Sequence, residues 1–530
     1  MKGKNVSPRR RPARRSAPLQ AMITALLFIL LAGTVARAQQ PLDGYTLFSP
    51  TNGRTTYLID MQGKTVHTWT HSSPGGYATY LLPDGLLLRP GSVANAQMRG
   101  AASSGLIEKI DWSGRVVWSF MYSGPTWIAH HDIEPMPNGN VLLIAWEAKS
   151  AAEATAMGRQ NAQVMWPDHI VEVAPAGGTG TIVWEWHAWD HLVQDRDPSK
   201  PDYGVIAEHP ELFNVNLISN AQMPGGGDWL HINGVSYNPE ADLIVISSHF
   251  MNEIYVIDHS TTTAEAAGHT GGRHGRGGDI LYRWGNPANY GAPGPVVFDV
   301  VHCSAWVPAG YPGAGNILAF NNAARARASV IVEIAPPLDG EGKFVHDAGQ
   351  AFGPAVPAWS YSAGNSFFSA HLGGNQRLSN GNTYLTEATE GDFREVAPDG
   401  TMVWEYNYSK EVARSLRYPA DYSGLAALHT ADAGAGLPNA PVLTAWNAPN
   451  PFPSSTMISY TTPAAGTVEL VLHDALGREV RRLSREQFAP GTGQLWWDGR
   501  DAAGRAVSPG IYYYRIRSGS ACADGKMIRY

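Results

Sequence analysis

Short runs of apolar residues, broken by turns rich in glycine, proline, asparagine and aspartate, fill most of the chain and predict many β-strands. One arrangement returns six times: an apolar strand that ends in an acidic residue, a turn, and a second strand that ends in tryptophan. The six pairs are Asp60 and Trp69, Asp111 and Trp118, Glu172 and Trp184, Asp258 and Trp284, Glu333 and Trp359, and Glu395 and Trp404. Because a two-stranded hairpin cannot bury its own apolar face, these copies predict a repeat architecture.

A second hairpin pattern lies between these copies, at residues 77–88, 130–144, 231–247, 302–320 and 371–387. Both patterns together supply four strands per repeat, the number that a propeller blade needs. We therefore expect an all-β fold, with a six-bladed β-propeller over residues 40–431. The spacing between tryptophans rises from about 45 to about 100 residues, which predicts insertions at 151–163, 191–227 and 259–278.

The composition changes after the last repeat. A linker rich in glycine, alanine and proline is expected over residues 432–445. From residue 446 to 530, strands alternate with glycine turns at about ten-residue spacing, which predicts a small Ig-like β-sandwich.

The first residues have the pattern of an export signal. Arginines at positions 9–15 precede an apolar run over 21–33, and small residues stand at Ala36 and Ala38. We expect residues 1–38 to be removed and the protein to be secreted or surface-located, with no transmembrane anchor. A membrane anchor is the alternative, although the run is short for a span. The net charge of −7 argues against a nucleic-acid partner.

Histidines recur at one end of the second hairpin pattern, six to eight residues before its turn. At about 3.3 Å per residue, each histidine stands about 20 Å from the turn, so equivalent copies place them at the same end of the propeller. We expect this ring of side chains to converge on the central channel as a ligand or reaction site. The residues are His131, His231, His302 and His371.

Other interpretations of these histidines stay open. A structural hydrogen-bonding role is the alternative for each histidine, and three of them would suit zinc. No carboxylate stands at ligand spacing, so we expect neither a metal nor a cofactor. The segment 259–278, rich in glycine, histidine and arginine, is expected to be a solvated loop, with metal binding as the alternative.

Four segments resemble the bacterial arylsulfotransferase family, whose members are six-bladed propellers. They are GYTLFSPTNGRTTYLIDMQGKTVHTW, DWLHINGVSY, HCSAW…FNNAARAR and NGNTYL…GDFREVAPDGTMVWEY, spread over residues 41–430. The resemblance implies an enzyme that moves a sulfuryl group from an aryl sulfate to a phenol through a sulfated histidine, without a nucleotide donor. The alternative function is a non-catalytic propeller that binds a ligand or partner at the cell surface.

The same resemblance implies residue roles. His371 matches the nucleophile, with His429 as its competitor, and His231 and His302 match further catalytic histidines. The substrate-binding candidates are Arg325, Arg327, His131 and Asn321. Neutral imidazole would attack sulfur, while arginine and a second histidine stabilise the sulfuryl oxygens.

The C-terminal region resembles the sorting domain of type IX secretion cargo and the Ig-like module of flagellar hook-cap proteins. The similarity rests on NAPNPFPSSTMISYTTP, HDALGREV, WWDGRDAAGRAVSPGIYYYRI and KMIRY. It implies the type IX secretion machinery as a partner and a route across the outer membrane.

Overall fold

The computed structural model describes residues 39–95, 97–98, 100, 102–218, 227–428, 443–448, 450–462, 466–487, 491–519 and 521–530. The expected signal peptide, most of the expected linker and the alternative nucleophile His429 lie outside these residues. Within the described ranges, no helix is both long and apolar enough to cross a membrane.

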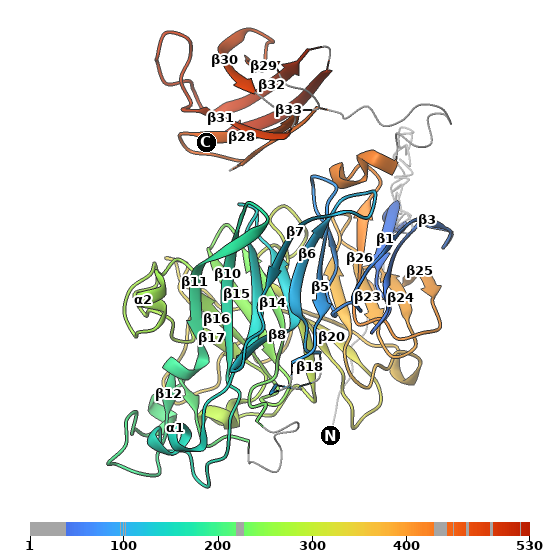
Figure 1. Cartoon of the computed structure of the whole chain (residues 1–530). Helices are drawn as coiled ribbons and strands as arrows, with labels where there is room; N and C mark the ends of the chain where they lie inside the picture. Colours follow the sequence, from blue (N-terminus) through green and yellow to red (C-terminus); the bar gives the residue numbers. More distant parts are fainter. Residues whose placement is uncertain are drawn as a thin grey trace, which may run out of the picture. The chain divides into compact units, whose positions relative to one another are not determined.

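Six four-stranded antiparallel sheets form the blades of the propeller, so the predicted fold is confirmed. Figure 1 shows these sheets following one another in chain order, from blue to orange. From the first to the fourth strand, blade 1 holds β26 (Ser415–Pro419), β1 (Gly44–Phe48), β2 (Thr55–Ile59) and β3 (Thr65–Thr70), and blade 2 holds β4 (Tyr80–Leu81), β5 (Leu87–Ser92), β6 (Gly105–Ile110) and β7 (Val116–Met121). Blade 3 holds β8 (Trp127–Pro135), β9 (Val141–Glu147), β10 (Asp168–Ala176) and β11 (Thr179–His187), and blade 4 holds β14 (Ile232–Asn238), β15 (Leu243–Ser248), β16 (Glu253–Asp258) and β17 (Tyr282–Trp284). Blade 5 holds β18 (Val301–Trp306), β19 (Ile317–Asn321), β20 (Val330–Ile334) and β21 (Trp359–Tyr361), and blade 6 holds β22 (Gly374–Arg377), β23 (Thr383–Glu387), β24 (Asp392–Val396) and β25 (Met402–Asn407).

Blade 1 joins the two ends of the propeller sequence. Its first strand is β26, the last strand of the propeller in the chain, and it pairs antiparallel with β1. The two strands lie side by side in Figure 1, one orange and one blue. The pairing satisfies backbone groups that would otherwise form open sheet edges at both ends of the repeat array.

The first strands line the axis of the propeller, because β8 contacts β14, β14 contacts β18, β18 contacts β22 and β22 contacts β26. Polar side chains bridge these neighbours. Asn233 donates from Nδ2 to the carbonyl of Val301 at 2.8 Å, and Asn375 donates to the carbonyl of Cys303 at the same distance. The axis is therefore held by hydrogen bonds between blades, as well as by apolar packing.

The recurrent tryptophans lie in the fourth strands, where each indole N–H donates to the next blade. Trp69 reaches the carbonyl of Asp111 at 3.1 Å, and Trp404 closes the circle by reaching the carbonyl of Met61 in blade 1 at 2.9 Å. The other four pairs are Trp118 with Thr179, Trp184 with Thr261, Trp284 with Pro354, and Trp359 with Pro398. The repeated tryptophan is thus a link between neighbouring blades.

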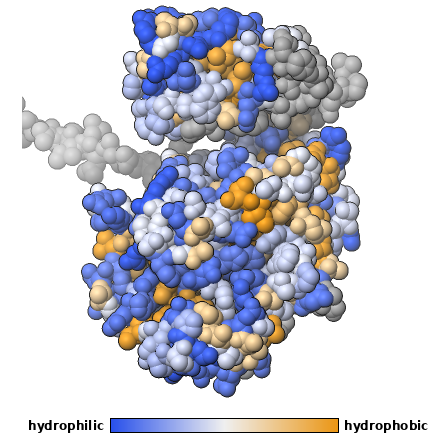
Figure 2. Space-filling model, turned by 60° about the vertical axis from the view of Figure 1, so that its left-hand side comes forward, coloured by the Kyte–Doolittle hydropathy of each residue, from blue (hydrophilic) through white to orange (hydrophobic). Residues whose placement is uncertain are grey.

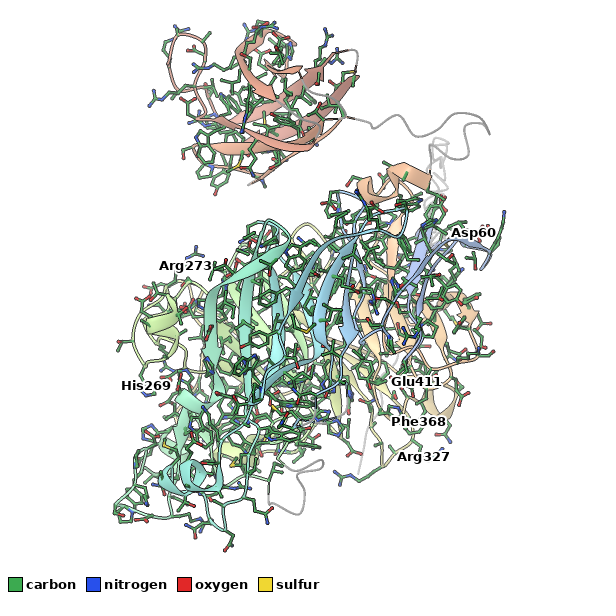
Figure 3. All side chains as sticks on the ribbon, in the orientation of Figure 1. Asp60, His269, Arg273, Arg327, Phe368 and Glu411 are labelled. Atoms are coloured by element: carbon green, nitrogen blue, oxygen red, sulfur yellow. The ribbon has the colours of Figure 1, made fainter. Side chains whose placement is uncertain are left out.

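The acidic residues of the repeats make two kinds of contact, and the kind differs from one repeat to another. Asp60, labelled in Figure 3, and Asp111 accept backbone N–H groups of their own turns. By contrast, Glu172 contacts His259 of blade 4 and Glu333 contacts Arg377 of blade 6. Turn chemistry therefore explains part of the pattern, and contacts between blades explain the rest.

Insertions extend blades 3 and 4. They carry α1 (Ala151–Ala156), the parallel strand pair β12 (Leu192–Val193) and β13 (Phe213–Asn214), and α2 (Thr263–Ala266). Ser150 and Glu153 form a capping box at α1, and Thr262 and Glu265 form another at α2, which fixes where these short helices begin. On the face shown in Figure 2, hydrophilic residues predominate and apolar residues form small separate groups.

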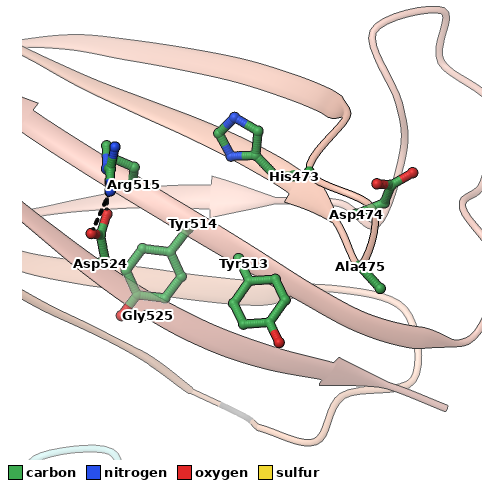
Figure 4. A pocket seen from close by; sticks show the side chains of 9 residues that line it. His473, Asp474, Ala475, Tyr513, Tyr514, Arg515, Asp524 and Gly525 are labelled. Carbon is green, nitrogen blue, oxygen red and sulfur yellow. Dashed lines mark hydrogen bonds and ion pairs between the residues drawn. The ribbon is translucent and has the colours of Figure 1, made fainter.

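The C-terminal region is a sandwich of two antiparallel sheets around the buried Trp497. One sheet holds β27 (Thr444–Ala448), β28 (Thr456–Thr462) and β31 (Gly491–Trp497); the other holds β30 (Glu479–Gln487), β29 (Gly466–Asp474), β32 (Gly510–Ser518) and β33 (Ala521–Arg529). Its surface has an open hollow of about 540 Å³ beside the Arg515–Asp524 ion pair (Figure 4).

Candidate active site

Four histidines from three blades lie close together at the axis of the propeller. His131 and His231 have ring centroids 4.5 Å apart, His249 follows at 4.9 Å from His231, and His302 lies 5.4 Å from His249. His131 belongs to β8, His231 immediately precedes β14, His249 immediately follows β15, and His302 belongs to β18. We call these four residues the axial histidine cluster.

The backbone of each contributing first strand is distorted at the cluster. His131, His231, Cys303 and Leu372 have positive φ angles of 51°, 53°, 47° and 60°. The pairing of β8, β14 and β18 with their second strands shifts register at this point. A left-handed conformation is costly for residues other than glycine, and bulges of this kind turn side chains toward sites. The same combination of a positive φ angle and a register shift recurs in the neighbouring blades 3, 4 and 5.

Side-chain partners orient three rings of the axial histidine cluster. Nδ1 of His131 lies 2.7 Å from Nδ1 of His130. Asp228 contacts Nδ1 of His231, which leaves Nε2 of that ring for the site. Asp228 also accepts the indole N–H of Trp146 at 3.1 Å. Nδ1 of His302 lies 2.7 Å from Oδ1 of Asn322, and its Nε2 accepts the backbone N–H of Leu372 at 3.3 Å. His302 is therefore the neutral tautomer protonated on Nδ1.

Burial keeps three rings of the axial histidine cluster, those of His131, His249 and His302, uncharged. It lowers the pKa of His302 to about 3, with the charges of His231 and His371 adding to the effect against the Asn322 hydrogen bond. Burial and the charge of His302 lower the pKa of His249 to about 2, and burial holds the pKa of His131 well below its usual range. At neutral pH these three imidazoles can accept protons only with difficulty.

A small cavity of about 20 Å³ adjoins the cluster, with room for about one water molecule. Its lining includes Tyr77, His131, His302, Cys303 and Arg414. Arg414 stands immediately before β26 and crosses to blade 3, where its two terminal nitrogens lie 2.6 and 3.0 Å from the two carboxylate oxygens of Asp132. This bidentate pair fixes a positive charge at the axis.

Of the residues predicted from the sequence, the structure brings His131, His231 and His302 together. His371 lies near them at the surface: its side chain is 52% exposed, and its Nε2 is 2.9 Å from Oε2 of Glu411. Arg327 lies over the ring of Phe368 at 5.0 Å. Figure 3 labels Arg327, Phe368 and Glu411 close together at one end of the propeller.

The remaining predicted residues lie elsewhere. Arg325 is exposed and pairs with Asp299 at 3.0 Å, so the structure does not bring it to the cluster. Asn321 bonds to the backbone of residues 297, 299 and 323, whereas the neighbouring Asn322 is the partner of His302.

The residues of the site that the sequence analysis does not predict include His249, Asp228 and Arg414. His249 ends a second strand, outside the repeated histidine position. Asp228 stands three residues before His231, a spacing that sequence alone could have suggested for an orienting carboxylate. Arg414 was missed because β26 was not recognised as the first strand of blade 1.

Two segments of the chain match models of known protein families. Residues 43–265 match the model of the arylsulfotransferase (ASST) family. The match runs from blade 1 into α2 in blade 4, so it contains His131, His231 and His249 but neither His302 nor Arg414. Residues 454–521 match the FlgD Ig-like domain. A search of curated proteins found no match.

Solved structures that match the chain include FlgD from Xanthomonas campestris, with 27% identity over 17% of this chain and 62% of that one, and a TM-score of 0.13. Streptogramin B lyase matches with 11% identity, 71% and 83% coverage and a TM-score of 0.32. AztD from Citrobacter koseri matches with 10% identity, 88% and 100% coverage and a TM-score of 0.30. At these scores the sheet order described above, rather than the likeness, defines the fold.

Proposed function

We propose that the propeller transfers a sulfuryl group from an aryl sulfate to a phenol through a sulfated histidine. The observation that carries the proposal is a set of imidazoles from several blades, two of them held by carboxylates, in a chain whose residues 43–265 match the arylsulfotransferase model. Sulfuryl transfer, like phosphoryl transfer, depends mainly on positioning and charge placement, which such a site supplies.

His371 is the proposed nucleophile. Glu411 accepts the Nε2 proton, so the lone pair lies on Nδ1, and the half-exposed ring is open to a substrate from outside. Nδ1 attacks sulfur, the bond between sulfur and the phenolic oxygen breaks, and the aryl group leaves as phenolate. The carboxylate of Glu411 offsets the positive charge that develops on the sulfated ring.

His231 is the proposed general acid and base. Asp228 fixes the orientation of its ring, as a carboxylate does for a catalytic histidine elsewhere. In the first half-reaction His231 protonates the leaving phenolate. In the second it removes the proton of the acceptor phenol, whose oxygen attacks sulfur and releases His371. The acceptor leaves as an aryl sulfate and both histidines return to their starting states.

Positioning and binding fall to other residues. Because Nε2 of His302 accepts the N–H of Leu372, His302 fixes the segment that carries His371. Arg327, on the same loop as Arg325 and beside Phe368, is the better placed arginine for the sulfuryl oxygens. Phe368 offers an aromatic face for the phenol ring.

The test uses purified full chain, 4-nitrophenyl sulfate and a phenol acceptor. We expect acceptor-dependent release of 4-nitrophenol and, with donor alone, a gain of one sulfuryl group on the peptide that contains His371. His371→Asn should abolish both readouts. Arg327→Ala should raise KM for the donor, while Arg325→Ala, the matched exposed arginine, should leave KM unchanged.

Failure of both readouts with every phenol tried would favour the alternative, a propeller that binds a ligand without turnover. Sulfation found on another histidine would refute the assignment of His371 while keeping the reaction. In that case His231 is the next residue to test, because it also has a carboxylate partner.

Export and sorting stay proposals as well. We propose that residues 1–38 direct export and that the C-terminal sandwich serves the type IX secretion machinery. Sequencing the N-terminus of protein recovered from the medium tests the first, with cleavage after Ala38 as the expected result. Loss of secretion on deleting residues 446–530 tests the second.

A further inference from the structure

A second group of histidines lies outside the axis, between two insertions of the propeller. His191 follows β11 and begins the insertion that contains β12, whereas His269 and Asp279 belong to the loop between α2 and β17. Nδ1 of His191 lies 2.8 Å from Oδ1 of Asp279, and Nδ1 of His269 lies 2.7 Å from the same oxygen. All three atoms lie within 4.8 Å of one another.

The hydrogen bonds of His191 leave a lone pair of its ring facing a lone pair of the Asp279 carboxylate. Nε2 of His191 lies 2.8 Å from the carbonyl oxygen of Ala266, which can only accept, so Nε2 must carry a proton. In the neutral ring Nδ1 then has a lone pair that faces the carboxylate of Asp279. One group has to join these two lone pairs: a proton, on the ring or on the carboxyl group, or a metal ion.

The arrangement around His191 is that of a supported metal ligand. Histidine ligands usually donate their other ring N–H to a backbone carbonyl or carboxylate, and Ala266 supplies that carbonyl. His191 is fully buried and stacks on Trp186, with ring planes 8° apart. A side chain at Gly278 would bring its Cβ to 2.6 Å from Nε2 of His191, so glycine is needed for the loop to approach the ring.

The other side of the group is open and acidic. The side chain of His269 is 54% exposed, which leaves its ring room to turn toward an ion. Figure 3 labels His269 at the edge of the propeller. The charges of Asp202 and Glu211 act on the ring of His269 together with the charge of Asp279. These carboxylates favour a cation, and the exposed face leaves a fourth ligand position for water.

We propose that His191, His269 and Asp279 bind one divalent transition-metal ion, zinc by ligand type. Two imidazole nitrogens and one carboxylate oxygen form a donor set typical of zinc with an open fourth position. The ion would join the insertion after β11 to the loop between α2 and β17. Its binding would release protons from the histidines and would weaken as the pH falls.

The first test measures zinc binding by the full chain after treatment with a chelator. Isothermal titration is expected to show one zinc ion per chain. His269→Ala should weaken this binding at least tenfold and, because the ring is half exposed, should leave the fold intact. The matched control is His274→Ala, which removes a histidine from the same loop and should leave zinc affinity unchanged.

A second readout follows the loop itself. Arg273, which is exposed and labelled in Figure 3, and Arg276 are tryptic sites in this segment. We expect zinc to slow cleavage after both arginines in the wild type and in His274→Ala, and to have no effect in His269→Ala. Titration with cobalt(II) should give the visible absorption of a four-coordinate ion.

Two results would overturn the proposal. One is the absence of saturable zinc binding by the wild type. The other is equal zinc affinity and equal protection from trypsin in both variants, which would place the ion elsewhere. Asp279→Asn offers an independent check, since it keeps the size of the side chain but removes the charge. It should lower affinity without disturbing far-UV circular dichroism.

Discussion

Replacing Trp404 by phenylalanine removes the link that closes the circle of tryptophans. The indole N–H donates to the carbonyl of Met61 at 2.9 Å, and such a hydrogen bond contributes about 1 kcal/mol. The indole face also lies 4.1 Å from the guanidinium of Arg417, whose side chain is fully buried. Weakening that cation–π contact costs about 0.5 kcal/mol. We expect Trp404→Phe to lower the free energy of unfolding by about 1.5 kcal/mol.

Urea denaturation followed by circular dichroism measures this change, with the midpoint expected to fall and the slope to stay constant. Trp496→Phe is the matched control, because Trp496 lies in the sandwich and is 55% exposed. Its propeller transition should equal that of the wild type. If Trp404→Phe unfolds within about 0.5 kcal/mol of the control, the indole hydrogen bond does not stabilise the closed ring.

Two further predictions concern individual side chains. Asp228→Asn should lower kcat about 10²–10⁴-fold in the sulfuryl-transfer assay, because the amide no longer fixes the protonated Nδ1 of His231, and its thermal midpoint should show that the fold is kept. His259 is the second case: burial lowers its pKa, but the hydrogen bonds with Asp242 and Glu172 outweigh burial and raise the pKa to about 9. The resulting stabilisation, about 3 kcal/mol, is complete below pH 6.5 and is lost as the pH rises through 9, so the stability gap between wild type and His259→Gln should shrink from pH 6 to 10. A pH-independent gap would contradict the assigned pKa.

Most of the fold followed from the sequence because repeats impose their own register. Each tryptophan marks a fourth strand, and six copies gave six blades. The sequence did not show that blade 1 takes its first strand from β26. That pairing joins residues more than 360 positions apart, and no local pattern in residues 415–419 distinguishes a closing strand from any other.

The candidate site was predictable to the extent that it repeats. His131, His231 and His302 share a position in the second hairpin, and the structure brings them together. Arg325 and Arg327 could not be separated by sequence, since both follow the same strand. Their environments differ only through distant residues, Asp299 for one and Phe368 for the other.

Closure of the ring also builds the site. Arg414 precedes β26 and reaches Asp132 on β8, which in turn accepts the backbone N–H of Val235 on β14 at 3.1 Å. Arg414 of blade 1 and Asp132 of blade 3, which both line the cavity, therefore keep their positions only while β26 is paired with β1. A change that opens this pairing should disperse the axial histidine cluster before the separate blades unfold. The pairing of β26 with β1 therefore has two consequences. It supports the circle of tryptophan hydrogen bonds at the outside of the propeller, and it fixes the positions of the side chains at the axis.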